Sequence, residues 1–177
     1  MTVDAGRSRH PERDRDDQGR PVNARPRDRF GRPLARGAAD ELVAREDPEE
    51  VVDSLDEALA TAVRLFDAQR FFEAHEFLEH IWKSAELDPA DRDFWKGVTQ
   101  VAVGCCHAQR GNAQGAVTLL ERSVGYLRSY PSPHHGILTE ALARTALRVC
   151  ADVKERGASP DMAFPRFPLA GPRPPGR

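Results

Sequence analysis

The chain has 177 residues, of which 26 are Lys or Arg and 28 are Asp or Glu, for a formal net charge of -2 at neutral pH. This length allows one domain with tails, and so small a charge provides no global field for binding nucleic acid or an anionic membrane. The longest apolar run, 101–106, is too short to cross a bilayer. The three cysteines lack Cys-x-x-Cys spacing, and the N-terminus is rich in Arg and Asp instead of apolar. These features predict a reducing, cytoplasmic location.

Residues 1–46 are predicted to be a flexible, Arg-rich arm. They hold 11 Arg and 9 acidic residues and almost no large apolar side chains, so they cannot bury enough surface to offset the entropy of ordering. Six Arg and one Asp fall within 20–37. Such a charge run is usually solvated, which argues against a nucleic-acid partner.

Residues 157–177 are predicted to be a Pro-rich tail. Six Pro and three Gly exclude regular helix from this segment. Its apolar residues Phe164, Phe167 and Leu169 would be free to lie along a groove of the preceding domain.

Residues 47–156 are predicted to form a helical domain. Asp47-Pro48, Asp88-Pro89 and Ser132-Pro133 each place a capping side chain before a Pro, which is favoured at the first position of a helix. Apolar residues recur with helical period and no segment has strand period. The expected helices cover about 52–66, 70–85, 91–110, 113–129 and 138–153. The fold class is therefore all-α, a compact bundle of about five helices.

Two segments of this domain resemble each other. DAQRFFEAHEFLEH (67–80) and HAQRGNAQGAVTLLER (107–122) share Ala-Gln-Arg and then an Ala, a Leu and an acidic residue. The similarity predicts a duplicated helical hairpin with tetratricopeptide-like spacing. Two copies are fewer than the three that usually sustain a solenoid, so a closed bundle is expected.

The helix over 70–85 carries polar residues in its predicted buried stripe. On a helical wheel Phe71, Leu78 and Trp82 mark the apolar face, with His75 in its middle and Glu79 beside it. A carboxylate there must be paired, protonated or bound to a metal, because an isolated buried charge is strongly unfavourable. The residues placed on the solvent side by the same wheel are Glu73, Glu76 and His80.

The helix over 91–110 offers partners for this stripe. It is apolar nearly all round, except for a face that carries Lys96, Gln100 and His107. Gly97 and Gly104 border that face, and their missing side chains would let a neighbouring helix approach closely. We therefore expect His75 and Glu79 to point toward Gln100 and His107.

Two interpretations of this cluster remain open. The four residues satisfy one another as a buried polar network, or His75, Glu79 and His107 bind Zn²⁺, Mn²⁺ or Fe²⁺ with water completing the shell. In the second case the additional ligand-binding residues are Trp82, Gln100 and Glu76. Open coordination positions would permit metal-dependent hydrolysis, although nothing in the sequence selects a substrate.

The string EAHEFLEHIWK (73–83), followed by HAQRGN (107–112) and GAVTLL, resembles the domain of unknown function 309 family of bacterial and archaeal proteins. The family pattern His-x-x-x-Glu-x-x-Trp is met by His75, Glu79 and Trp82. The resemblance covers about 54–130 and implies an all-helical bundle of unknown biochemical role, for which metal binding through the motif has been suggested. Such proteins often have a Gly where this chain has Gln69-Arg70, and a Gln at the position of Lys96.

Other familiar sites are incomplete in this sequence. A zinc protease needs His-Glu-x-x-His, and the fifth position here is Glu79. A ferritin-like di-iron site needs Glu-x-x-His, and no Glu lies three residues before a His. The buried positions of Cys105 and Cys106 indicate core residues, not nucleophiles. The loop residues His134 and His135 are expected to be solvated.

An interaction module is the alternative class of function. Its tetratricopeptide-like hairpins would leave a groove for a partner, and the buried polar cluster would be structural. Residues 71–91 hold six acidic residues and one Lys, so a binding surface there would be acidic. The expected partner is thus a small molecule or a protein, and not a membrane.

Overall fold

The computed structural model describes residues 25–35, 37–39, 41 and 47–171. The chain divides into two compact units, 1–43 and 44–177, and each is described by itself. Most of the predicted N-terminal arm, including 1–24, lies outside the described residues.

The described part of the first unit contains a tight turn around Asp28. Its Oδ1 accepts hydrogen bonds from the backbone N–H groups of Phe30 and Arg32, at 2.9 and 2.8 Å. Arg27 and Pro33 form an isolated antiparallel bridge across this turn. The segment interpreted as a flexible arm therefore includes a locally hydrogen-bonded hairpin.

The second unit is helical. It contains α1 (Pro48–Val51), α2 (Leu55–Asp67), α3 (Phe71–Lys83), η1 (Pro89–Asp91), α4 (Arg92–Gln109), α5 (Ala113–Leu127) and α6 (Thr139–Arg156). No strand is present in the described ranges, so the all-α class and the bundle of five longer helices are confirmed. No helix in these ranges combines the length and the apolar character that crossing a bilayer requires.

Local capping explains where several helices begin. The side chains of Asp47 and Asp88 accept hydrogen bonds at the starts of α1 and η1, as the Asp-Pro pairs predict. Asn112 caps α5 in the same way. The third pair, Ser132-Pro133, starts no helix, because the chain continues in a loop until α6 begins at Thr139.

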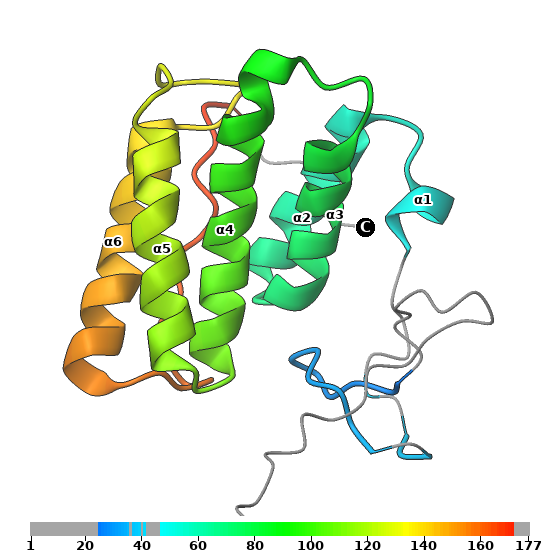
Figure 1. The fold of residues 1–177 in the computed structure, drawn as a ribbon, viewed down its shortest axis with the longest axis vertical. Helices are drawn as coiled ribbons and strands as arrows, with labels where there is room; N and C mark the ends of the chain where they lie inside the picture. Colours follow the sequence, from blue (N-terminus) through cyan, green and yellow to red (C-terminus); the bar gives the residue numbers. More distant parts are fainter. Residues whose placement is uncertain (1–24, 36, 40, 42–46, 172–177) are drawn as a thin grey trace, which may run out of the picture. The chain divides into compact units, whose positions relative to one another are not determined.

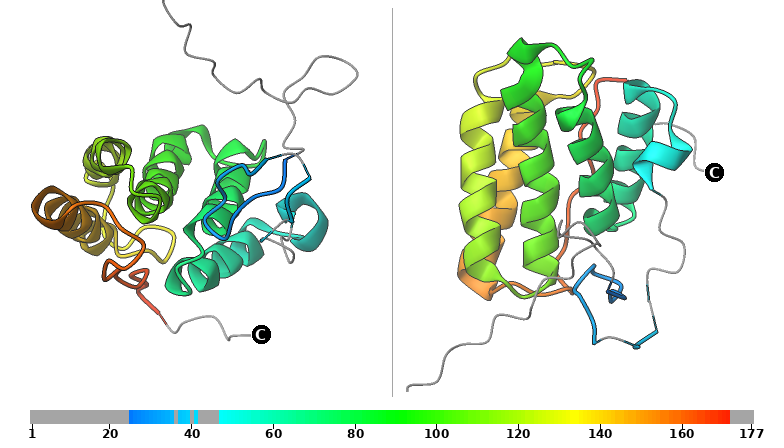
Figure 2. Two further views of the ribbon diagram at one scale, coloured as in Figure 1. Left: turned by 90° about the horizontal axis from the view of Figure 1, so that it is seen from below. Right: turned by 45° about the vertical axis from the view of Figure 1, so that its right-hand side comes forward.

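The five longer helices form two layers (Figures 1 and 2). One layer holds α3, α4 and α5. The other holds α2 and α6, which are separated by the C-terminal segment coloured orange to red. The chain order places neighbouring helices side by side, with the most extensive packing between α4 and α5.

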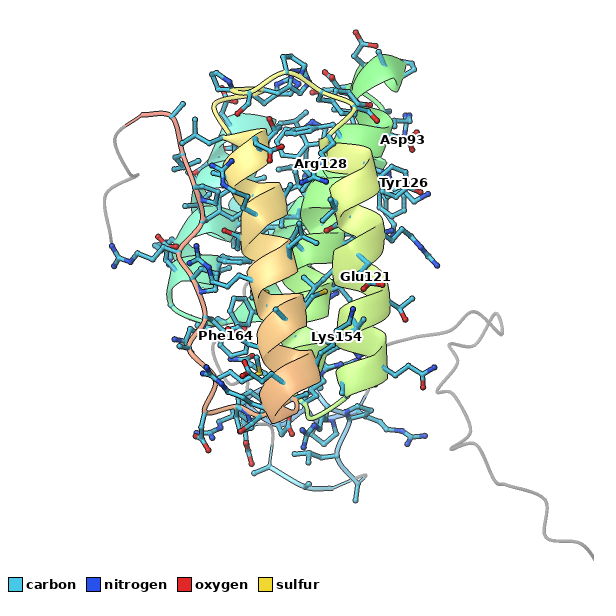
Figure 3. The ribbon with its side chains drawn as sticks, turned by 90° about the vertical axis from the view of Figure 1, so that its left-hand side faces the viewer. Asp93, Glu121, Tyr126, Arg128, Lys154 and Phe164 are labelled. Carbon is cyan, nitrogen blue, oxygen red and sulfur yellow. The ribbon has the colours of Figure 1, made fainter. Side chains whose placement is uncertain are left out.

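The C-terminal segment completes the core between α2 and α6. Phe167 is fully buried and packs edge-on against Phe66, with ring centroids 5.3 Å apart. Phe164, labelled in Figure 3, packs in the same manner against Phe71 at 4.9 Å. The aromatic residues of the C-terminal segment therefore lie in a groove of the helical domain, as the sequence allowed.

Two glycines of α4 allow close packing with α5. A Cβ atom built on Gly104 would lie 2.5 Å from Cγ of Leu120, and one on Gly97 would lie 2.8 Å from Cβ of Tyr126. The close approach that these glycines predict is present, but the approaching helix is α5. The expectation that α3 would occupy this face is wrong, because the face is already filled.

The two helical hairpins have matching turns. Gln69, with φ 59°, and Gly111, with φ 76°, both adopt the left-handed conformation that favours glycine. Their N–H groups donate to Phe66 and Ala108 in equivalent positions. Gln69 is therefore the counterpart of Gly111, and the resembled family often has Gly at the position of Gln69. When the two turns are matched in this way, the two Ala-Gln-Arg segments do not align with each other. Gln109 Nε2 joins the turns by donating to the Gln69 carbonyl at 2.9 Å.

Candidate functional site

The orientation of α3 differs from the predicted wheel. Glu73 is buried, with 2% of its surface exposed, and its Oε1 accepts a hydrogen bond from Arg70 Nε at 2.7 Å. Glu79 has 38% of its side chain exposed, and its Oε1 lies 2.9 Å from Lys83 Nζ. The predicted positions of Glu73 on the solvent side and Glu79 in the buried stripe are therefore both wrong.

A different set of apolar residues explains this rotation. Ala74, Phe77 and Ile81 are almost completely buried, and together with Phe71 and Leu78 they centre the buried face about a quarter turn away from His75. The helical wheel placed at the centre of the buried face residues that lie at its edge.

The motif residues on α3 lie at that edge. His75 is half-buried, its Nδ1 contacts the backbone carbonyl of Phe72, and its ring packs on the Phe72 ring with centroids 5.0 Å apart. Trp82 is also half-buried, and its backbone carbonyl accepts a hydrogen bond from Arg92 at 3.4 Å.

Of the two predicted partners on α4, His107 is engaged elsewhere. His107 Nδ1 lies 2.9 Å from Nδ2 of Asn112, in the turn before α5. Burial and the positive charge of Arg110 lower the pKa of His107. Gln100 is half-buried, and its buried Oε1 has no hydrogen-bond partner in the structure.

The three predicted ligands His75, Glu79 and His107 are not brought together. In the described part of the chain the ligand atoms of these residues form no group that could hold a metal ion. The metal implied by the family resemblance therefore does not fit these residues as they are arranged. The physical reason is that α5 covers the α4 face on which His107 and the glycines lie.

A groove of about 390 Å³ runs beside α3. The residues lining it are Asp47, Pro48, Glu49, Glu76, Glu79, His80, Lys83 and Ser84. Two of these carboxylates come from the start of α1 and two from the exposed side of α3, against one Lys. The groove is therefore acidic, and it contains two residues that the sequence analysis singled out, Glu76 and Glu79.

A second polar cluster lies at one end of the bundle. Asp91, the last residue of η1, accepts hydrogen bonds from His134 Nε2 through Oδ1 and from His135 Nε2 through Oδ2, each at 2.7 Å. Burial raises the pKa of the Asp91 carboxyl, but the hydrogen bonds and charges of the two histidines outweigh it and hold that pKa below its ordinary value. Within the described ranges, these three residues form a group that could hold a metal ion.

This cluster was not predicted from the sequence. His134 and His135 were expected to be solvated loop residues, whereas both contact Asp91. The pair of adjacent histidines was the only signal. Their partner lies 43 residues away in the sequence, and no helical or strand periodicity connects the two segments.

The cysteines do not form a reactive site. Cys105, Cys106 and Cys150 are buried free thiols. Burial raises the pKa of Cys105 and of Cys150, which keeps these thiols protonated at neutral pH. Their environment is that of core residues, as expected for unactivated cysteines.

Comparison with known proteins gives a match for the segment that contains α3. Residues 59–119 match the family model described as a domain of unknown function, DUF309. This segment is therefore similar to the DUF309 family. The uncharacterized protein YpuF of Bacillus subtilis (strain 168) is 41% identical to the chain over 66 residues, which are 36% of this chain and 37% of that protein. The DUF309 segment contains all of α3, whereas His134 and His135 lie outside it.

Proposed function

We propose that this chain is a binding domain whose acidic groove, between α1 and α3, takes a positively charged segment of a partner protein. The observation that carries the proposal is the charge of the groove lining. Asp47, Glu49, Glu76 and Glu79 supply four carboxylates, and among the described lining residues Lys83 is the only Lys or Arg.

The pairing of Glu79 and of Asp47 leaves their negative charge in place. Lys83 and Glu79 form an ion pair whose side chains are 64% and 38% exposed, and such pairs contribute little energy. Asp47 caps α1 through a 3.1 Å bond from the Glu49 N–H, and this bond from a neutral backbone group does not neutralise its carboxylate. A guanidinium group suits this lining, because it can bridge two carboxylates with its fixed fork of donors.

The shape of the groove favours a side chain of a partner over an enclosed small molecule. Small-molecule pockets are usually concave and mostly apolar, whereas this groove is polar and open along one helix. Among the residues that the structure describes, its lining also forms no group of three metal-ligating atoms. The proposal accords with the acidic binding surface predicted for 71–91.

The test is fluorescence anisotropy with labelled peptides of equal length, one Arg-rich and one Glu-rich. We expect the Arg-rich peptide to bind, and its affinity to fall as salt is raised. The double variant Glu76→Gln/Glu79→Gln should bind at least about tenfold more weakly, since two charge-assisted contacts are lost.

A matched control separates the groove from net charge. Glu86 and Glu155 are exposed and lie outside the groove, so Glu86→Gln/Glu155→Gln makes the same change in charge. Equal weakening by both double variants, or equal binding of the two peptides, would show that the groove is not the binding site.

A further inference from the structure

We propose that Asp91, His134 and His135 bind a divalent transition-metal ion, with Zn²⁺ preferred over Mn²⁺ and Fe²⁺. This cluster shares no residue with the acidic groove. Zn²⁺ is favoured because two imidazoles and one carboxylate suit it, and because it binds such ligands more tightly than the other two ions.

The three ligand atoms are already close to a coordinating arrangement. Nε2 of His134 and Nε2 of His135 each lie 2.7 Å from one oxygen of Asp91, and one ligand atom from each residue lies within 4.8 Å of the others. Zinc bonds to nitrogen and oxygen are about 2.0–2.2 Å long. Side-chain movements on the order of 1 Å would therefore let all three atoms reach one ion.

The Asp91 side chain contacts the two histidines and does not cap α4. It precedes α4 directly, where an Asp side chain commonly accepts a backbone hydrogen bond, yet its side chain makes no capping bond. Its two oxygens face the two imidazoles. Figures 1 and 2 show that the connection between α5 and α6 lies at the same end of the bundle as the start of α4.

The loop that carries the histidines is held by the rest of the domain. His134 and Ile137 exchange backbone hydrogen bonds at 2.9 and 2.8 Å, and Ile137 is fully buried. The C-terminal segment adds a bond from Ala170 N to Gly136 O at 2.9 Å. A preformed loop reduces the entropy lost when the ion binds.

Aromatic rings support both imidazoles. The His134 ring lies 4.6 Å from the Phe94 ring and 5.1 Å from the Tyr130 ring, measured between centroids. The His135 ring lies 5.3 Å from the Trp95 ring. These contacts restrict rotation of the imidazoles, and their low polarity strengthens the attraction between the carboxylate and a cation.

The cluster remains open to solvent on one side. The exposed fractions of the side chains are 16% for Asp91, 22% for His134 and 40% for His135. An ion can therefore enter from water and keep water in its remaining positions, as in sites with three protein ligands. When bound, such an ion would lower the pKa of its coordinated water.

The experiment uses the full chain without a His tag, freed of metal with a chelator. Isothermal titration calorimetry with Zn²⁺ should give one binding site per chain. Asp91→Asn, His134→Gln and His135→Gln should each weaken Zn²⁺ binding at least about tenfold, since each removes or weakens one ligand. His80→Gln and His107→Gln, which alter histidines outside the cluster, should leave Zn²⁺ affinity unchanged.

X-ray absorption at the zinc edge gives a readout that does not depend on variant folding. The wild-type complex should show two imidazole ligands and otherwise oxygen ligands. Failure of the wild-type protein to bind Zn²⁺ would overturn the proposal in favour of a plain Asp–His hydrogen-bond network. Loss of binding in His80→Gln, or a single imidazole at the ion, would overturn the assignment of these three ligands.

Discussion

The acidic groove and the Asp91–His134–His135 cluster differ in how the fold assembles them. The groove joins one face of α3, where helical periodicity places Glu76, Glu79 and Lys83 together, to the start of α1, which supplies Asp47 and Glu49. The end cluster joins two segments that lie 43 residues apart. Within the part of the chain that the structure describes, the end cluster alone brings three ligand atoms within 4.8 Å of one another.

This difference shows what one helix face can supply. Residues one turn apart share a surface, and their combined charge can attract a flexible ligand. A metal ion needs ligand atoms that converge on one point, which usually requires side chains from different elements. Helical periodicity predicted a metal site on α3, whereas the side chains that converge lie in a loop and at a helix start.

The largest predicted effect tests the rotation of α3 that places Glu79 on the groove. Glu73 is 3% exposed in its side chain and its charge partner is Arg70. Arg70→Ala should lower the free energy of unfolding by about 3 kcal/mol, because it leaves a buried carboxylate unpaired. Urea unfolding measures this loss.

Adding a second substitution separates charge from packing. Glu73→Gln in the Arg70→Ala background removes the unpaired charge and should restore most of the lost stability. A loss below about 1 kcal/mol in Arg70→Ala would mean that Glu73 reaches solvent, and that α3 is rotated as the wheel first predicted.

The next effect tests whether α5, packed on the glycine face of α4, keeps α3 away from that face. A Cβ on Gly104 would meet Cγ of Leu120 at 2.5 Å, so Gly104→Ala should destabilise the bundle by about 1–3 kcal/mol through overpacking. Thermal unfolding gives the measurement. The matched control is Gly125→Ala on α5, where nothing lies within 4 Å of the new Cβ, and which should stabilise the helix by up to about 1 kcal/mol.

A smaller effect is expected at Glu79 itself. Because its ion pair with Lys83 is largely exposed, Glu79→Gln should change the free energy of unfolding by no more than about 0.5 kcal/mol, and less at high salt. A member of a buried polar network would cost more. Urea unfolding at two salt concentrations distinguishes the two cases.

Much of the fold follows from local signals in the sequence. Capping at Asp47, Asp88 and Asn112 and the period of the apolar residues define where most of the helices lie. The close contact across Gly104 also follows, because a missing side chain at a helix crossing has a direct steric meaning. The capping signals depend on residues within a few positions of each other in the chain.

The site could be predicted only in part. Glu76 and Glu79 do line a groove, but the sequence does not reveal which neighbour covers each face of α4, and α5 instead of α3 fills the glycine face. The His134 and His135 contacts with Asp91 depend on a loop conformation held by the C-terminal segment. Periodicity carries no information about such long-range contacts.

The smallest predicted effect concerns His107, which was predicted from the sequence to be a metal ligand. Burial and Arg110 lower its pKa in the folded state, so the unfolded chain binds more protons as the pH falls. Its contribution to stability is present above the ordinary histidine pKa and is lost as the pH falls through the lowered folded value. His107→Gln should therefore lose less stability than wild type between pH 7.5 and pH 5, as measured by urea unfolding.

Proton NMR of the histidine rings sharpens the comparison of the two regions, because Zn²⁺ should shift the resonances of His134 and His135 and leave the titration of His107 unchanged. A Zn²⁺-dependent change at His107 alone would return the metal site to the helix pair proposed from the sequence.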